Sequence, residues 1–473
     1  MTYVSCILPD KFDPNTLYVS FSNLKRADFK PYVFKSTDLG KTWSSISANL
    51  PENGPVHALQ QDPVKKELLF LGNEFGFWFS PDAGAKWIQL KAGIPTIAIY
   101  DIAIQEREND LVVASFGRGF YILDDYTPLR NFVPSILDKE GHLYPIREGI
   151  MFSQTDGKYG QGSAYFSAPN PPYGITFTYF VKDQVKTLKE IRKEAQAKAI
   201  KDGTPPPYPT YADLRAEEEE QEPFLVFTIK DSNGKVVKTI KTGQKTGMNR
   251  INWEYDLEGT STINVREKAN PMGTPPAVAT ALPGKYTVEL ARNVGGVITQ
   301  LAGPESFSVR LINNFTLPAK DRASVISFIE KGTKLVNSVT ATISKMEDYS
   351  KDVQYGKQLV FTYGGPDDLM KELKDLETQL KDLEIRFNGN GIINRLQDAA
   401  EPGLRQRTWG IRWISPNQDV PESAMEQYDI VTSEMTKILP QIEQIGQSIE
   451  RLRKEFDRLG YPWTPGREIP KWK

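Results

Sequence analysis

The N-terminal part of the chain repeats a unit of about 43 residues, and this repeat limits the possible folds more than any other feature. The three copies contain the apolar runs NTLYVSF, ELLFLGN and DLVVASF, which begin at Asn15, Glu67 and Asp110. A second pair of matching runs, FWFSPD and FYILDD, lies at residues 77–82 and 120–125. Each run has the length and apolarity of a short buried strand. A period near 43 with about four short strands per unit predicts consecutive β-propeller blades.

Two octets inside the repeat share a pattern, STDLGKTW at residues 36–43 and SPDAGAKW at residues 80–87. In such a turn a carboxylate accepts hydrogen bonds from nearby backbone N–H groups, a glycine adopts positive φ, and a tryptophan needs an apolar surface to pack on. The octets therefore predict two equivalent hairpins with a structural role. Their residues are Ser36, Asp38, Gly40 and Trp43 in the first copy and Ser80, Asp82, Gly84 and Trp87 in the second.

With these octets, residues 1–126 resemble the Asp-box, or bacterial neuraminidase (BNR), repeats of sialidases, two-propeller xyloglucanases and the Vps10 domain of sortilins. They are most similar to the long bacterial Vps10/sortilin-like repeat proteins, which are often labelled glycosyl hydrolases. The run FGRGFYILDDYTPLR resembles the phrase that ends the propeller in those proteins. The resemblance implies the C-terminal part of an Asp-box β-propeller, with about three blades. The third copy has neither the Gly nor the Trp after LDD, so we expect the repeats to end at Asp125.

Three blades do not close a propeller, because known propellers have four to eight and an open one exposes strand edges and apolar faces. We therefore expect the remaining blades to come from a longer parent chain, in which Met1 is an internal start, or from a partner chain.

Residues 127–318 contain strands of alternating pattern and the hairpin dipeptide Asn233-Gly234, which predict an immunoglobulin-like antiparallel β-sandwich. A charged insertion at about 185–222 has a basic helical half, a proline-rich break and an acidic half. A docking tail is one interpretation of this charge pattern. We favour a solvated helical hairpin between two strands.

Residues 319–473 contain apolar residues at helical spacing in three long segments, which predict an antiparallel helical bundle with a tail rich in Pro and Trp. A dimeric coiled coil is the alternative. The connections between the segments are long enough to reverse the chain, so the bundle is favoured.

The composition argues against several functions. The 58 basic and 60 acidic side chains give no nucleic-acid signature. With one cysteine and two histidines, a zinc or iron site rich in Cys or His is disfavoured, while an oxygen-only Ca²⁺ or Mg²⁺ site stays open. We expect no metal, no cofactor, no signal peptide and no membrane span in these residues. An extracytoplasmic location is implied by the resemblance alone.

Candidate ligand-binding residues lie in the loops that meet at one end of a propeller. They are His57, Glu74, Asp101 and Arg118, and an acid, an imidazole and an arginine fork suit a sugar or a carboxylate ligand. No catalytic residue is assigned. We expect a non-catalytic binding or scaffold protein that recognises a protein or glycan ligand. The alternative is a sialidase- or xyloglucanase-like glycoside hydrolase with its catalytic acids in the absent blades.

Overall fold

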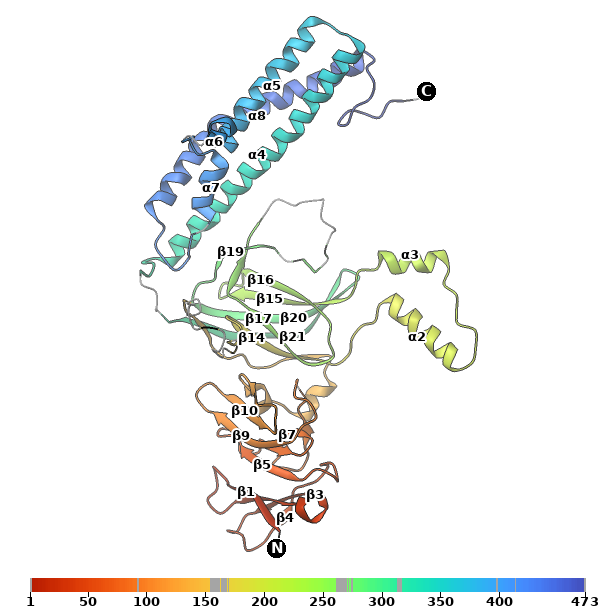
Figure 1. The fold of residues 1–473 in the computed structure, drawn as a ribbon, viewed down its shortest axis with the longest axis vertical. Helices are drawn as coiled ribbons and strands as arrows, with labels where there is room; N and C mark the ends of the chain where they lie inside the picture. The colour runs from red at the N-terminus through yellow and green to blue at the C-terminus, as the bar shows by residue number, and fades with distance from the viewer. Residues whose placement is uncertain are drawn as a thin grey trace.

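The computed structural model describes residues 2–91, 93–153, 162, 168, 170–260, 270, 272–273, 275–312, 317–396, 399–412 and 414–471. The molecule is a mixed β and α structure, in which β-sheets are followed by a C-terminal helical region (Figure 1). The predicted order of β-rich and helical parts is therefore confirmed. The sheets and helices follow one another along the long axis of the molecule, with the N-terminus at one end and the helices at the other.

The strands from β1 to β11 form three antiparallel sheets in chain order. The first consists of β1 (Tyr3–Pro9), β2 (Leu17–Asn23), β3 (Asp28–Ser36) and β4 (Ser44–Ser45), with the short helix η1 (Leu24–Arg26) between β2 and β3. The second consists of β5 (Val56–Gln61), β6 (Leu69–Asn73), β7 (Gly76–Ser80) and β8 (Ile88–Gln89). The third consists of β9 (Ile99–Gln105), β10 (Asp110–Ser115) and β11 (Phe120–Leu123).

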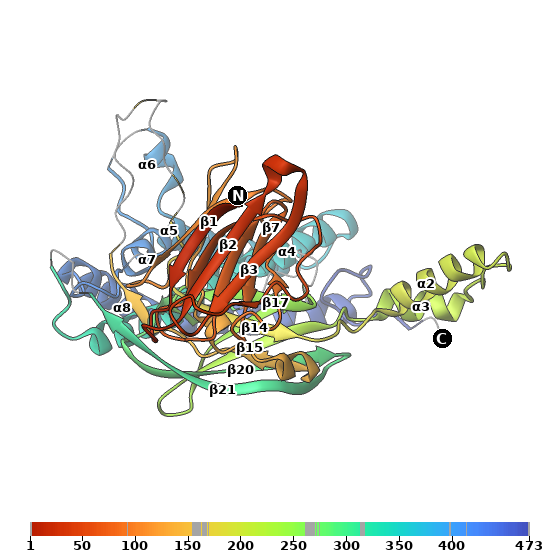
Figure 2. The same ribbon diagram turned by 90° about the horizontal axis from the view of Figure 1, so that it is seen from below.

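These three sheets stack face to face. One apolar cluster joins the first sheet to the second and includes Tyr18, Val33, Leu71 and Trp87. Another joins the second sheet to the third and includes residues such as Phe70 and Leu111. The stack is visible from below in Figure 2, where β1, β2 and β3 lie foremost.

The prediction of four strands in each unit is wrong for the third unit, which has three. After β11 the chain enters the short helix α1 (Thr127–Arg130) instead of an Asp-box hairpin and a fourth strand. The cause is visible in the sequence, because the third copy lacks the Gly and Trp of the octet.

Two further sheets pack against each other around a common core. One has the order β12 (Gly141–Leu143), β14 (Ile175–Val181) and β17 (Gly247–Trp253). The other has the order β13 (Gly149–Met151), β21 (Val297–Leu311), β20 (Gly284–Val294), β15 (Phe224–Asp231) and β16 (Val236–Gly243). Strands β18 (Asp256–Glu258) and β19 (Ala277–Thr280) pair separately, and η2 (Pro134–Asp138) precedes β12.

The expectation of a purely antiparallel arrangement in this part is wrong at one strand. β13 pairs in parallel with β21, so that Gly149 lies opposite Val309. Between β14 and β15 the chain forms α2 (Leu188–Lys201) and α3 (Tyr211–Glu219), within the insertion that the charge pattern predicts. These two helices project away from the sheets (Figure 1).

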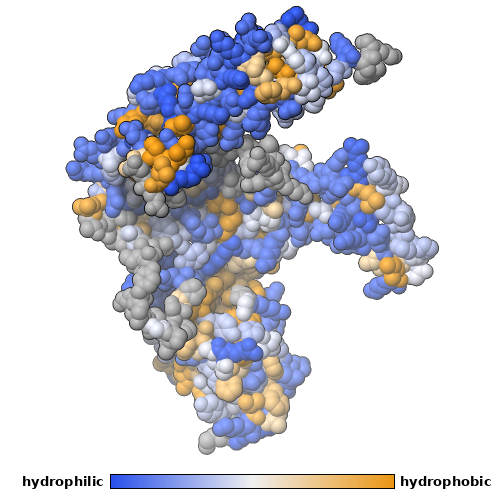
Figure 3. Space-filling model, turned by 45° about the horizontal axis from the view of Figure 1, so that its top comes forward, coloured by the Kyte–Doolittle hydropathy of each residue, from blue (hydrophilic) through white to orange (hydrophobic). Residues whose placement is uncertain are grey.

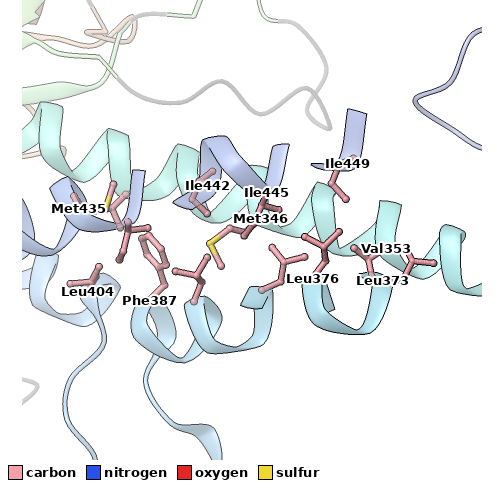
Figure 4. Packing of buried hydrophobic residues seen from close by; sticks show 14 of the residues in the cluster. Met346, Val353, Leu373, Leu376, Phe387, Leu404, Met435, Ile442, Ile445 and Ile449 are labelled. Carbon is pink, nitrogen blue, oxygen red and sulfur yellow. The ribbon is translucent and has the colours of Figure 1, made fainter. Parts of the chain in front are cut away.

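The C-terminal region contains the long helices α4 (Arg322–Tyr363), α5 (Asp367–Asn388) and α8 (Glu422–Arg458), with the shorter α6 (Gly391–Arg395) and α7 (Leu404–Arg412). Consecutive long helices run in opposite directions, so α4 and α8 are parallel to each other. Tyr428 near the start of α8 contacts Phe328 near the start of α4, and Tyr461 beyond the end of α8 contacts Tyr363 at the end of α4. The apolar stripes meet in one core, part of which Figure 4 shows between α4, α5 and α8.

Candidate functional site

A small polar and aromatic cluster, here called the rim cluster, lies where strands of the second and third sheets begin and end. It consists of His57 on β5, Glu74 after β6, Tyr100 on β9 and Phe116 after β10. These positions meet because each antiparallel unit returns its loops to the same end and the stack places the units side by side. His57 Nε2 and Glu74 Oε2 are 2.8 Å apart. The imidazole stacks on the Tyr100 ring at a centroid distance of 4.4 Å.

The rim cluster is partly open to solvent. The Tyr100 and Phe116 rings are 5.7 Å apart, and these side chains are 49% and 70% exposed. Two accessible aromatic rings next to a carboxylate form a surface on which a ring-shaped or apolar ligand can stack while a polar group of the ligand bonds to Glu74. Sequence reasoning placed His57, Glu74 and Phe116 at this end of the repeats but chose only polar residues as ligand contacts, and it missed Tyr100.

The other two predicted residues are placed differently. Asp101 follows Tyr100 on β9, and its carboxylate accepts a hydrogen bond from the backbone N–H of Ile102 at 2.8 Å. Arg118 lies in the turn between β10 and β11, flanked by Gly117 and Gly119, which both have positive φ. In the part of the chain that the structure describes, its exposed side chain forms no hydrogen bond or ion pair. The structure thus joins His57 to Glu74 and leaves Arg118 free at the tip of its loop.

The Asp-box carboxylates serve their own turns. Asp38 accepts hydrogen bonds from the Thr42 hydroxyl (2.7 Å), the Thr42 backbone N–H (2.8 Å) and the Ser36 hydroxyl (2.8 Å). These bonds lower the pKa of Asp38 to about 2, the Thr42 hydroxyl having the largest effect. Asp82 makes the matching bonds to the Lys86 backbone N–H and the Ser80 hydroxyl.

The hairpins have the same backbone conformation, because Leu39 and Gly40 in one and Ala83 and Gly84 in the other all have positive φ. In each hairpin the serine hydroxyl also accepts a bond from the glycine N–H at 2.8 Å, Ser36 from Gly40 and Ser80 from Gly84.

The tryptophans of the two octets differ in environment, contrary to the expected equivalence. Trp87 is 1% exposed, and its indole N–H donates to the carbonyl of Ile46 in the preceding unit. Trp43 is 43% exposed, and its indole N–H donates to Gly40 in its own turn. The physical reason is that the first sheet has no preceding unit among residues 2–91 to supply the equivalent of Ile46.

A buried ionic network anchors the end of the repeats, and sequence reasoning did not find it. The side chain of Asp62 is fully buried and accepts hydrogen bonds from Arg130 Nε and the Tyr126 hydroxyl, each at 2.7 Å. Asp62 also accepts bonds from the backbone N–H groups of Val64 and Lys65. Burial and the neighbouring carboxylate raise the pKa of Tyr126. The residues YTPLR at 126–130 therefore clamp onto the second sheet, and no local sequence pattern pairs them with Asp62, which lies 68 positions before Arg130.

A larger cavity of about 1140 Å³ lies between the third sheet and the pair β14 and β17. Its walls carry both signs of charge, with Glu108, Asp110, Asp124 and Glu148 facing Arg107, Arg147 and Arg250. Arg250 donates to the backbone carbonyls of Asp124 (2.7 Å) and Asp125 (2.6 Å), and Arg147 forms an ion pair with Glu108. Burial raises the pKa of Asp124, and the charge of Asp110 adds to this. These bonds join the third sheet to the following pair of sheets, so the cavity walls have a structural role.

No three His, Cys, Asp or Glu side chains among the described residues are grouped so that they could hold a metal ion. Of the helices described, none is both long enough and apolar enough to cross a membrane.

Comparison with known proteins gives a partial similarity. No family model matches the chain. Xyloglucanase Xgh74A of Acetivibrio thermocellus is 24% identical over 188 residues, which is 36% of this chain and 20% of that enzyme; a second sequence of the same name and species matches equally. The chain thus spans about a fifth of the length of the curated relatives it matches.

Among solved structures, the extracellular domain of a putative hybrid two-component system from B. thetaiotaomicron covers 65% of this chain and 32% of its own, at 8% identity. Its TM-score of 0.21 carries no argument about the fold. The comparisons therefore relate part of this chain, distantly, to a xyloglucanase.

Proposed function

We propose that the chain is a non-catalytic binding or scaffold protein of the Vps10/sortilin-like Asp-box type, and that its rim cluster recognises a glycan or protein ligand. The observation that carries this proposal is the division of roles among the acids of the first three sheets. Asp38, Asp82 and Asp62 are occupied by bonds to their own turns or to a buried arginine, whereas Glu74 pairs with His57, whose imidazole stacks on the exposed Tyr100 ring. The partial similarity to a xyloglucanase supports a sugar as the ligand. An extracytoplasmic location belongs to the same proposal.

The propeller part of the proposal is supported by register. Trp78 lies opposite Leu71 in the second sheet as Phe34 lies opposite Val19 in the first. By the same register Ile7 in the first sheet corresponds to Leu59 in the second. The second-sheet residues are buried between sheets, whereas Ile7 and Trp43 are exposed. We propose that a further unit of the same kind, from a longer parent chain or a partner chain, covers this face.

A binding experiment tests the proposed function. Xyloglucan oligosaccharides and a panel of other glycans and peptides are titrated by calorimetry into the wild type and the Phe116→Ala and Glu74→Gln variants. We expect each variant to lower the affinity of any bound ligand about tenfold or more, the scale of losing one stacking or charge-assisted contact. Tyr208→Ala is the matched control, because Tyr208 is an exposed aromatic residue far along the chain. Unchanged affinity in both rim variants would refute the rim cluster as the binding surface.

The second candidate function is glycoside hydrolysis, favoured by the similarity to xyloglucanase. It requires two carboxyl groups about 5–10 Å apart, one protonated and one ionised. In this proposal the catalytic acids come from units outside these residues. Release of reducing sugar ends from xyloglucan by this chain joined to the remaining units, and not by this chain alone, would favour hydrolysis over binding alone.

A further inference from the structure

Helices α2 and α3 form a projecting arm, defined here as residues 187–220 (Figure 1). The arm begins and ends at one place, because the Leu188 N–H donates to Glu220 Oε2 at 2.8 Å. Both helices have a complete capping box, at Thr187 with Glu190 and at Thr210 with Asp213. The sequence therefore specifies both helix starts locally.

The arm buries none of its helical residues. Its internal contact is polar, since Arg192 forms a two-pronged ion pair with Glu217 and Gln196 donates to the Pro207 carbonyl. Helices of 14 and 9 residues are marginal in water without tertiary packing, because nucleation is unfavourable. Caps and one ion pair stabilise such helices only modestly.

The apolar side chains of the arm point outward and lie at helical spacing. Leu188 and Ile191 are three residues apart on α2, and Tyr211 and Leu214 are three apart on α3; all four are exposed. Figure 3 shows the arm as a mainly hydrophilic projection with separate hydrophobic residues on it. Each helix thus presents a short apolar stripe of two side chains that its own hairpin does not cover.

The charges of the two helices are opposite. α2 carries five basic and two acidic side chains, a net charge of +3, and α3 carries one basic and four acidic, a net charge of −3. Lys198 falls on the α2 stripe, seven residues after Ile191, and Glu218 falls on the α3 stripe, four after Leu214. Neither side chain forms an ion pair with any residue that the structure describes. The surface of the arm is therefore complementary to itself.

We infer that the arm is a dimerisation element, and that its partner is the arm of a second copy of this chain. A two-fold axis places α2 of each copy against α3 of the other, so that both contacts form together. The apolar stripes bury one another, and Lys198 of each copy meets Glu218 of its partner. This inference does not depend on the proposed ligand-binding function, because the arm lies between β14 and β15, whereas the rim cluster lies on the second and third sheets.

Charge exchange tests the inference on the full chain. Sedimentation velocity over a range of concentrations measures the mass of the wild type and of the Lys198→Glu and Glu218→Lys variants. We expect the wild type to show an arm-dependent dimer and each single variant to weaken it about tenfold or more, since two like-charge contacts replace two opposite ones. An equimolar mixture of the two variants has one contact with restored charge pairing and one with the charges exchanged. We expect it to recover the wild-type dimer as a heterodimer.

Two controls separate this element from other association. The first replaces residues 188–219 by a short Gly-Ser linker, which the adjacent ends of the arm permit, and it should abolish the dimer. The second, Lys235→Glu, reverses a charge on the exposed β15–β16 turn and should leave the dimer unchanged. A wild type without arm-dependent dimer, a dimer that survives deletion of the arm, or a mixture that fails to recover would each overturn the inference. Far-UV circular dichroism of the single variants shows that the helices remain folded.

Discussion

The carboxylate of Asp38 shows how a residue that looks catalytic can belong entirely to its turn. The sequence was sufficient to predict this, because Ser, Asp and Gly at fixed spacing specify a local hydrogen-bond network. The proximity of His57 and Glu74 was also predictable, because the repeat places both residues at the same end of the second sheet. The ion pair between Asp62 and Arg130 was not, because the two residues are 68 positions apart and no local pattern joins them.

Replacing Asp38 by Asn should lower stability at neutral pH and leave ligand affinity unchanged. Its pKa is depressed to about 2 in the folded protein, against an unfolded value near 3.9. The contribution of the carboxylate is therefore complete above about pH 4 and is lost as the pH falls toward 2. The difference in urea midpoint between wild type and D38N, measured at pH 6 and at pH 3, should shrink at the lower pH. A difference that grows on acidification would contradict this.

Replacing Asp62 by Asn should cost about 3–5 kcal/mol, because the positive charge of Arg130 then stays largely buried without its partner. Urea unfolding at pH 7 measures the change. Glu108→Gln is not a suitable control, because Glu108 lines the cavity. The control is Lys351→Ala. Lys351 forms an exposed ion pair with Asp348, and its loss should cost less than about 1 kcal/mol. Similar costs for both variants would show that the Asp62 network is not the clamp we describe.

At the scale of elements, sequence analysis predicted the helices and strands that show a local periodic pattern. The strands of the repeats, the hairpin at Asn233-Gly234 and the three long helices all appear near the predicted segments. The short strand β13 was missed because three residues carry no pattern, and its parallel pairing with β21 depends on contacts across 160 positions. The domain boundaries at residues 126 and 318 stay predictions.

Helix α4 packs so closely against α5 and α8 at Gly356 that no larger residue fits there without a shift. A Cβ at Gly356 would lie 2.7 Å from Leu373 Cδ2 and 2.8 Å from Phe456 Cζ. Gly356→Ala should therefore destabilise by about 1–3 kcal/mol through overpacking, although alanine has the better helix propensity. Gly410→Ala on α7 is the matched control, because its Cβ would meet nothing closer than 3.8 Å. We expect the control to stabilise by up to about 1 kcal/mol. Thermal unfolding measures the midpoint of both variants. Equal shifts of the midpoint would argue against the packing of the three helices.

The two octet tryptophans allow a comparison between equivalent elements. Trp87→Ala should cost about 3–5 kcal/mol, since it leaves a cavity between the first and second sheets. Trp43→Ala should cost less than about 1 kcal/mol in this chain, because its ring lies half in solvent. Chemical unfolding of both variants measures the difference. A large cost at Trp43 would mean that another part of the protein covers the first sheet in solution.

At the scale of the whole molecule, the sheets stand in series, and Ile7 on the first sheet and Ile122 on the third are exposed. Sequence analysis expected exposed apolar side chains because three units do not close a propeller. It did not foresee the cavity between the third sheet and the following sheets, because the charged walls come from segments far apart in the sequence. Such junctions depend on the relative placement of whole sheets, which no local periodicity records.

The last strand of the third sheet, β11, exposes apolar side chains to solvent. Ile122 is 62% exposed, whereas Phe79, at the corresponding place in the second sheet, is 3% exposed. Phe120 on the same strand is also exposed, so β11 presents an apolar edge that other chains can contact. The double variant Phe120→Lys and Ile122→Lys should therefore reduce concentration-dependent light scattering of the full chain severalfold and change its unfolding midpoint little.

The same change at the buried positions, Phe77→Lys and Phe79→Lys, is the control and should unfold the stack, because it places two unpaired charges between sheets. Deletion of the arm separates this association from the arm-dependent dimer, since the two surfaces are distinct and the scattering due to β11 persists without the arm. If the β11 variant scatters as strongly as the wild type, the exposed strand does not drive association. The proposal that further units of the same kind cover the ends of the stack would then lose its energetic basis, because apolar faces that remain stable in water need no cover.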